Sequence, residues 1–191
     1  MIDADAVAID ASGNAWFADA YVAPALSKFS SGGTPIPLTS AIATGGGLAA
    51  PGPYVIAIDA SGNVWAACSS SLAEFTNSGT AISTSAGFPG GGLANPKGIA
   101  IDGAGNVWLA NYNSGGVSEF SKAGVAITPA PSGYNAAGVL SGAYGVAIDS
   151  SGDVWVASAD THSLDELVGT GTPTINLLSV AVKNNTIATA P

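Results

Sequence analysis

The side chains that could recognise a ligand in this chain lie at the ends of its apolar stretches and in the segments between them. Tyrosine rings offer flat surfaces for stacking, and carboxylate, amide and hydroxyl groups offer hydrogen bonds, which together suit a sugar or another small polar molecule. We assign nine such residues to a ligand-binding site: Asp19, Tyr21, Tyr54, Asn111, Tyr112, Tyr144, Ser158, Asp160 and His162. A plainer interpretation is that the tyrosines only cap exposed apolar edges of the fold.

His162 raises a second, catalytic hypothesis. It is the only histidine and lies close to Asp160 in the sequence. A histidine beside a carboxylate titrates near neutral pH, as general acid–base catalysis in a lyase or hydrolase requires. A solvated histidine with no catalytic role fits the same residues. Replacing His162 by alanine separates the two, because an enzyme would lose its activity whereas a binding protein would keep its affinity.

The sequence contains no pattern typical of a metal or cofactor site, so we expect neither. Cys68 is the single cysteine, and no cluster of cysteine and histidine accompanies it, which favours a buried, inert thiol. Four aspartates each precede a Ser-Gly or Ala-Gly turn, where a carboxylate accepts backbone N–H groups. They are Asp10, Asp59, Asp102 and Asp149. A calcium loop would need more carboxylates in each turn.

Composition limits the classes of partner. The 191 residues carry a net charge of −9, with four lysines and no arginine, so no basic face for nucleic acid or an anionic membrane surface can form. No apolar run is long enough to span a bilayer, and the first residues lack the basic and apolar regions of a signal peptide. The lack of arginine and the richness in small residues favour an extracytoplasmic origin, as one part of a larger bacterial protein.

A motif that occurs four times must position the candidate residues. Its copies read VAIDASGNAWFAD, IAIDASGNVWAAC, IAIDGAGNVWLAN and VAIDSSGDVWVAS, and they place all four tryptophans about 45 residues apart. A second motif follows each copy and reads LSKFSSGGT, LAEFTNSGT, VSEFSKAGV and LDELVGTGT. Two motifs that keep register over four copies indicate a structural repeat.

Each repeat predicts four short strands. The first is the apolar segment before the aspartate, the second carries the tryptophan, and the third is the apolar segment of the second motif. A glycine turn leads into an irregular fourth strand, which contains prolines in most copies and is therefore expected at an edge.

The tryptophan strand indicates how these sheets pack. Its side chains alternate between two faces, one with tryptophan and alanine and the other with residues such as Val107 and Leu109. Both faces are apolar, so each small sheet must be covered on both sides. Sheets stacked face to face around an axis satisfy this requirement, and the arrangement is a β-propeller.

The segment PKGIAIDGAGNVWLANYNSGGVSEFSKAG, which begins at Pro96, resembles the blade consensus of NHL-repeat propellers and of the related streptogramin-lyase-like propellers. The resemblance implies the fold and not the activity, because that lyase chemistry uses several histidines with a metal and a glutamate. Here only His162 is available, and the candidate glutamates Glu74, Glu119 and Glu166 fall in third strands.

We therefore predict an all-β fold, a single β-propeller of four four-stranded antiparallel blades. The expected blades are about 1–50, 51–94, 95–141 and 142–191. One rim receives only short turns, whereas the other receives the long, variable loops and the residues assigned to the site. That distribution favours a non-catalytic ligand-binding or interaction module.

Four blades in an open arc would expose two apolar blade faces. Exposed faces of this kind drive association. We expect a homo-oligomer, most simply a two-fold dimer that forms an eight-bladed ring, with a tightly closed four-bladed monomer as the main alternative.

Overall fold

The computed structural model describes residues 4–20, 25–38, 46–49, 51–129, 131–135 and 139–173, and these residues form four antiparallel sheets. The first sheet consists of β1 (Ala4–Ile9), β2 (Ala15–Asp19), β3 (Ala25–Phe29) and β4 (Pro35–Ile36). The second consists of β5 (Val55–Ile58), β6 (Val64–Ala67) and β7 (Leu72–Phe75). The third consists of β8 (Pro96–Ile101), β9 (Val107–Asn111) and β10 (Val117–Phe120). The fourth consists of β11 (Ala143–Ile148), β12 (Val154–Ser158) and β13 (Ser163–Leu167).

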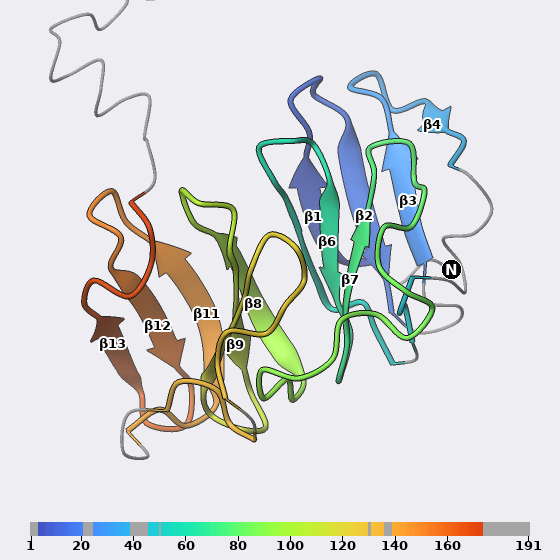
Figure 1. The fold of residues 1–191 in the computed structure, drawn as a ribbon. Coiled ribbons are helices and arrows are strands. Elements are labelled where there is room, and N and C mark those ends of the chain that lie inside the picture. Colours follow the sequence, from blue (N-terminus) through green and yellow to red (C-terminus); the bar gives the residue numbers. More distant parts are fainter. Residues whose placement is uncertain are drawn as a thin grey trace, which may run out of the picture.

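The predicted all-β propeller fold is confirmed. The sheets stand side by side as successive blades of an arc (Figure 1), and their innermost strands contact one another in the order β1, β5, β8 and β11. The described residues contain no helix, and hence none that is long and apolar enough to cross a membrane.

The fourth strands are shorter than predicted. Within the described ranges the first blade alone has one, β4, whereas the corresponding segments of the second and third blades contribute isolated bridges such as Phe75–Ala81 and Phe120–Ala126. Glycines and prolines interrupt both segments, and proline has no N–H to donate to a ladder. In the last blade most of this segment lies outside the described residues.

The tryptophans fill the junctions between blades. Trp16, Trp65 and Trp108 have no exposed surface. Each belongs to an apolar cluster with the following blade; Trp16, for example, shares its cluster with Val64 and Phe75. At each of these junctions the tryptophan ring and the small alanines of one blade therefore pack against larger aliphatic and aromatic side chains of the following blade.

The repeated aspartates are structural, and they do more than close the turns. In the second blade Asp59 Oδ1 accepts the backbone N–H groups of Ser61 and Asn63 at 2.8 and 2.9 Å. Its Oδ2 accepts the indole N–H of Trp65 at 3.2 Å. Corresponding bonds tie Trp16, Trp108 and Trp155 to the aspartates of their own blades. The aspartate thus holds both the turn and the ring that fills the junction.

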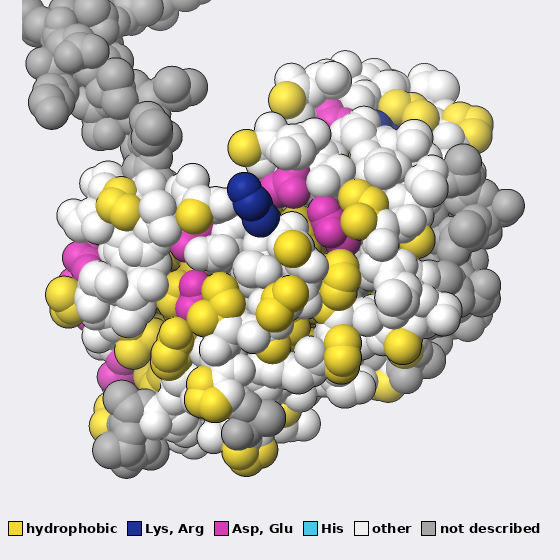
Figure 2. Space-filling model, viewed as in Figure 1, with side chains coloured by type: hydrophobic (Ala, Val, Ile, Leu, Met, Phe, Trp, Pro, Cys, Tyr) yellow, Lys and Arg dark blue, Asp and Glu magenta, His cyan; other side chains and the backbone are white. Residues whose placement is uncertain are grey.

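Apolar side chains also reach the surface in many places (Figure 2), and several of them lie on the outward faces of the first and last blades. Val7 and Ile9 of β1 are 57% and 62% exposed, and Leu164 of β13 is 66% exposed. The described part of the chain is therefore an open arc.

Candidate functional site

The innermost strands of three blades carry a β-bulge close to their first residue. The pairing register shifts between Ala4 and Ala6 in β1, between Pro96 and Gly98 in β8, and between Ala143 and Gly145 in β11. A bulge adds one unpaired residue and re-aims its side chain. The residues added in this way are Asp5, Lys97 and Tyr144.

These bulge residues occupy one position of the repeat. Each lies three residues before the alanine that pairs with the blade's tryptophan, as Ala100 pairs with Trp108. Tyr54 holds the same position in the second blade, where its N–H donates to the carbonyl of Ala67 at 2.9 Å. Four blades thus bring four equivalent residues to the beginning of their innermost strands, on the loop-rich rim.

The four residues line one cavity of about 240 Å³, together with Ala6 and Val55. We call Asp5, Tyr54, Lys97 and Tyr144 the mouth ring. Although they share one position in the repeat, they are chemically different: a carboxylate, an ammonium group and two phenol rings.

The mouth ring combines three modes of recognition. The Lys97 ammonium lies 4.1 Å from the centre of the Tyr54 ring, a distance typical of a cation–π contact. Tyr144 is 54% exposed, and Tyr112 meets it edge to face with the ring centres 6.3 Å apart. Asp5 is exposed. A hydrogen-bond acceptor, a donor and an accessible aromatic face therefore surround the same cavity.

Two of the residues assigned to the site from sequence are internal supports. Asn111 is fully buried; its Nδ2 donates to Ser118 Oγ at 2.7 Å and its Oδ1 accepts the N–H of Ala94 at 3.1 Å. Ser158 is also buried and donates to Asp165 Oδ2 at 3.0 Å. Both side chains hold neighbouring strands and loops and do not line the cavity.

Asp19, Asp160 and His162 do not line the cavity. Asp19 is half-buried at the end of β2, and Tyr21 is outside the described residues. Asp160 is exposed and accepts a hydrogen bond from Ser141 Oγ at 3.2 Å. His162 is exposed in the turn before β13, and within the described ranges no hydrogen bond or ion pair joins it to Asp160.

Sequence reasoning missed Asp5 and Lys97. Their position precedes the repeated apolar motif, where the four copies read DAVAID, YVIAID, KGIAID and YGVAID. The first letter varies while the next five stay similar, which is the signal that could have identified the ring.

The buried ionisable groups lie elsewhere, in the packing between strands and blades. Lys28 Nζ lies 3.1 Å from Asp10 Oδ2 and 2.6 Å from the side-chain oxygen of Asn77 in the next blade. Burial disfavours the Asp10 carboxylate, but hydrogen bonds from Asn14, Lys28 and Asn77 outweigh it and hold its pKa well below its ordinary value. This cluster joins the first two blades.

Two glutamates take the place of Lys28 in the inner blades. Burial raises the pKa of Glu74 and of Glu119, and the nearby Asp59 and Asp102 carboxylates act in the same direction. Tyr134 donates its hydroxyl to Glu119 at 3.1 Å and stacks on Trp108. Burial also raises the pKa of the Cys68 thiol, and the prediction that this cysteine is buried is confirmed.

Within the described ranges no three histidine, cysteine, aspartate or glutamate side chains gather in a way that could hold a metal ion. The mouth ring has one carboxylate and one ammonium group. Its arrangement suits the binding of a polar, uncharged or weakly charged molecule through hydrogen bonds and stacking.

Comparison with known proteins extends the fold assignment. No family model and no curated protein matches the sequence. Among solved structures, a streptogramin B lyase superposes with a TM-score of 0.61 at 14% identity, over 90% of this chain and 53% of that one. The virginiamycin B lyase of Staphylococcus aureus gives a TM-score of 0.59 at 17% identity, over 90% and 54% of the two chains.

A third similar structure is the extracellular domain of a hybrid two-component system from B. thetaiotaomicron, with a TM-score of 0.61 at 19% identity, over 94% of this chain and 26% of that one. This chain spans about half the length of the two lyases. At these identities the likeness shows the fold alone. The fold implied by the resemblance to streptogramin-lyase-like propellers is confirmed.

Proposed function

We propose that this propeller module is a non-catalytic binding protein that takes a saccharide into the mouth ring. The observation that carries the proposal is the convergence of Asp5, Tyr54, Lys97 and Tyr144, from one repeat position in four blades, on a single cavity. The scaffold positions around these residues repeat closely, whereas the ring residues differ. Such a contrast is expected where a rigid framework presents recognition groups.

The ring chemistry favours a sugar. Sugar hydroxyls both donate and accept hydrogen bonds, so one can donate to the Asp5 carboxylate while another accepts from the Lys97 ammonium. The exposed Tyr144 ring offers an apolar face to a pyranose, and Tyr112 supports that ring edge to face. The cavity of about 240 Å³ is below the roughly 300 Å³ at which pockets for drug-sized ligands begin, so one sugar unit fits at a time.

Charge argues against polyanionic ligands. The chain carries a net charge of −9, and Lys97 is the one cation of the ring, directly beside Tyr54 and in the same cavity as Asp5. Nucleic acid and anionic membranes remain poor partners on this ground. An extracytoplasmic location belongs to the same proposal, and one of the similar structures is an extracellular domain.

The catalytic alternative would use His162 with Asp160. Both side chains are exposed, and the hydrogen bond that holds Asp160 comes from Ser141. A lyase or hydrolase would need the two residues oriented toward a bound substrate, and neither lines the mouth cavity. The binding role therefore has more support than the catalytic one.

The test is a glycan array that displays neutral and uronic-acid oligosaccharides, followed by titration calorimetry with the strongest binder. We expect Asp5→Asn and Tyr144→Ala each to weaken binding at least tenfold, because each removes a group that faces the cavity. Asp160→Asn is the matched control for Asp5→Asn, since it makes the same change at an exposed aspartate outside the lining, and its affinity should equal the wild type.

Two results would overturn the proposal: no saccharide on the array binds, or Asp5→Asn and Tyr144→Ala bind as tightly as the wild type. His162→Ala addresses the alternative. A binding protein keeps its affinity in this variant and leaves the saccharide unchanged by mass spectrometry. An enzyme converts the saccharide and stops doing so when His162 is replaced.

A further inference from the structure

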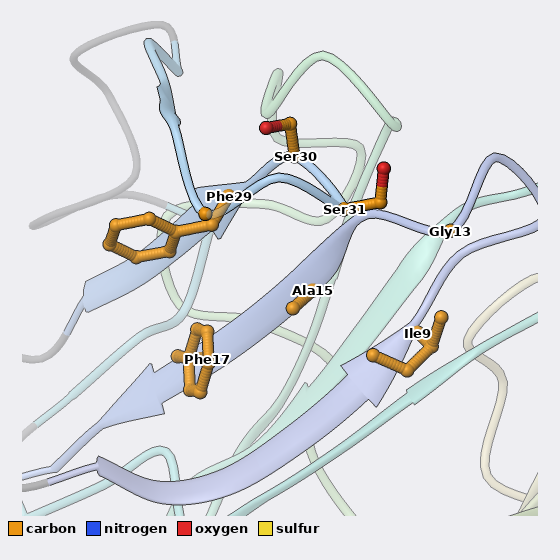
Figure 3. Close-up of a pocket in the computed structure, with 8 residues that line it drawn as sticks. Ile9, Gly13, Ala15, Phe17, Phe29, Ser30 and Ser31 are labelled. Carbon is orange, nitrogen blue, oxygen red and sulfur yellow. The ribbon is translucent and has the colours of Figure 1, made fainter.

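The outward face of the first blade is an uncovered apolar surface. Ile9, Ala15, Phe17 and Phe29, from β1, β2 and β3, line a groove of about 480 Å³ on one side of the sheet (Figure 3). Val7 on the same side of the sheet is 57% exposed, whereas Ile56, which holds the same position of the repeat in the second blade, is 6% exposed. We call this surface the leading face.

The outward face of the last blade is uncovered as well. Trp155 is only half-buried, and Ala157 beside it is exposed. Leu164 is 66% exposed, whereas Leu26 and Leu72, at the same position of the repeat, are 6% and 0% exposed. We call this surface, formed by Trp155, Ala157 and Leu164, the trailing face.

The two faces are the two halves of a junction that the chain already contains three times. In the first junction Trp16, Ala18 and Leu26 of one blade pack in one cluster with Ile56, Val64 and Phe75 of the next. The trailing face repeats the first of these groups as Trp155, Ala157 and Leu164, and the leading face repeats the second as Val7, Ala15 and Phe29. The second and third junctions join tryptophan and aliphatic faces in the same order.

We propose that a second copy of this chain covers both faces. The trailing face of each copy packs on the leading face of the other, which makes two identical junctions related by a two-fold axis and closes a ring of eight blades. A face-to-tail contact of this kind closes only if the curvature of the arc fits, and otherwise it grows into a filament. The inference does not depend on the saccharide proposal.

Two observations favour a second copy over other occupants. The faces lie at opposite ends of the arc (Figure 1), so one chain does not bring them together in this structure. The arc also superposes on only about half of each lyase chain, which indicates that four blades of this curvature fill about half of a larger propeller. A second copy supplies an equal number of blades with the matching faces.

No cation lies among the described residues of the two faces, and their ionisable side chains are carboxylates. Asp5 lines a small pocket with Val7 and Phe17 of the leading face, Asp19 ends the strand that carries Phe17, and Glu166 pairs with Trp155 on the trailing face. Association should therefore depend on burial of apolar surface and should persist at high salt, where contacts between exposed charges are screened.

Light scattering coupled to gel filtration tests the proposal on the full 191-residue chain. We expect a mass of about twice the 18.4 kDa of one chain, in low and in high salt. Phe17→Glu on the leading face and Leu164→Glu on the trailing face should each reduce it to 18.4 kDa. Val125→Glu is the matched control, because Val125 is 64% exposed but belongs to neither face, and this variant should stay paired.

Mixing the two variants tests the direction of packing. A dimer of either variant alone has a substituted face in both of its junctions. A dimer with one chain of each variant keeps one junction in which both faces are intact, so a species of double mass should reappear in the mixture. A wild type at 18.4 kDa at every concentration overturns the proposal, as does an open-ended series of larger masses. A dimer that persists in one variant alone also overturns it, because that result means that like faces pair. Circular dichroism shows that each variant is folded.

Discussion

The cost of removing a junction tryptophan should depend on its place in the arc. Trp108 has no exposed surface: Tyr134 stacks on it, with ring centres 5.8 Å apart, and Val154 and Val156 of the next blade share its cluster. Trp155 holds the same position of the repeat but is only half-buried. Truncation of each to alanine therefore compares one residue type and one local sequence in two tertiary environments.

The magnitude follows from buried area. A tryptophan side chain buries about 150–250 Å², which at about 25 cal/mol per Å² corresponds to roughly 4–6 kcal/mol. The alanine that remains offsets part of this loss, so Trp108→Ala should lower the free energy of unfolding by about 3–5 kcal/mol. Trp155→Ala should cost less in the single chain, by up to about a third, because part of the ring is already in water.

Urea denaturation followed by circular dichroism measures both values, with Val125→Ala as a surface control that should change stability by less than about 0.5 kcal/mol. A loss below about 1 kcal/mol for Trp108→Ala would refute the account of the tryptophans as junction fillers. Equal losses for the two variants at the lowest protein concentration would refute the assignment of Trp155 to an open face. If the chain pairs, the cost of Trp155→Ala should rise with concentration, because the second copy then covers the ring.

Two further predictions concern buried charge. Lys28→Met removes the cation beside Asp10 and should lower the free energy of unfolding by about 3 kcal/mol at pH 7. The pKa of Asp10 is depressed from its ordinary 3.8, so this difference should shrink as the pH falls below that value, in urea titrations at a series of pH values. Glu119→Gln should stabilise the fold at pH 7, because burial raises the pKa of Glu119 above 4.5 and disfavours its charged form. The gain should disappear near pH 4, and Asp160→Asn, the corresponding change at an exposed carboxylate outside both blade faces, should have little effect; a gain that is equal at both pH values would contradict this explanation.

The repeat alone was enough to predict the blades. Period-two alternation left both faces of the tryptophan strand apolar, and a sheet with two apolar faces must be covered on both. The role of Asp10, Asp59, Asp102 and Asp149 in their turns was also predictable, because a carboxylate before a glycine turn has only local partners. The indole hydrogen bonds to these aspartates were not predicted, since they depend on how each ring lies in its junction.

The positions of the candidate binding residues were harder to predict. Tyr54, Tyr112 and Tyr144 lie at the mouth or beside it, whereas Asn111 and Ser158 proved to be buried supports. A polar residue at the end of a strand has the same sequence appearance whether its side chain faces a ligand or a neighbouring strand. Only the packed blades determine which of the two it does.

Tertiary structure alone decided two properties of this protein. The first is the mouth ring, because the bulges that aim Asp5, Lys97 and Tyr144 are shifts of pairing register, which arise between strands and not within one. The second is which blade faces are covered. Trp16 and Trp155 have nearly the same local sequence, but the following blade buries the first completely, whereas the second stays partly exposed at the end of the described arc. Burial depends on what packs against a surface as well as on the residues that form it.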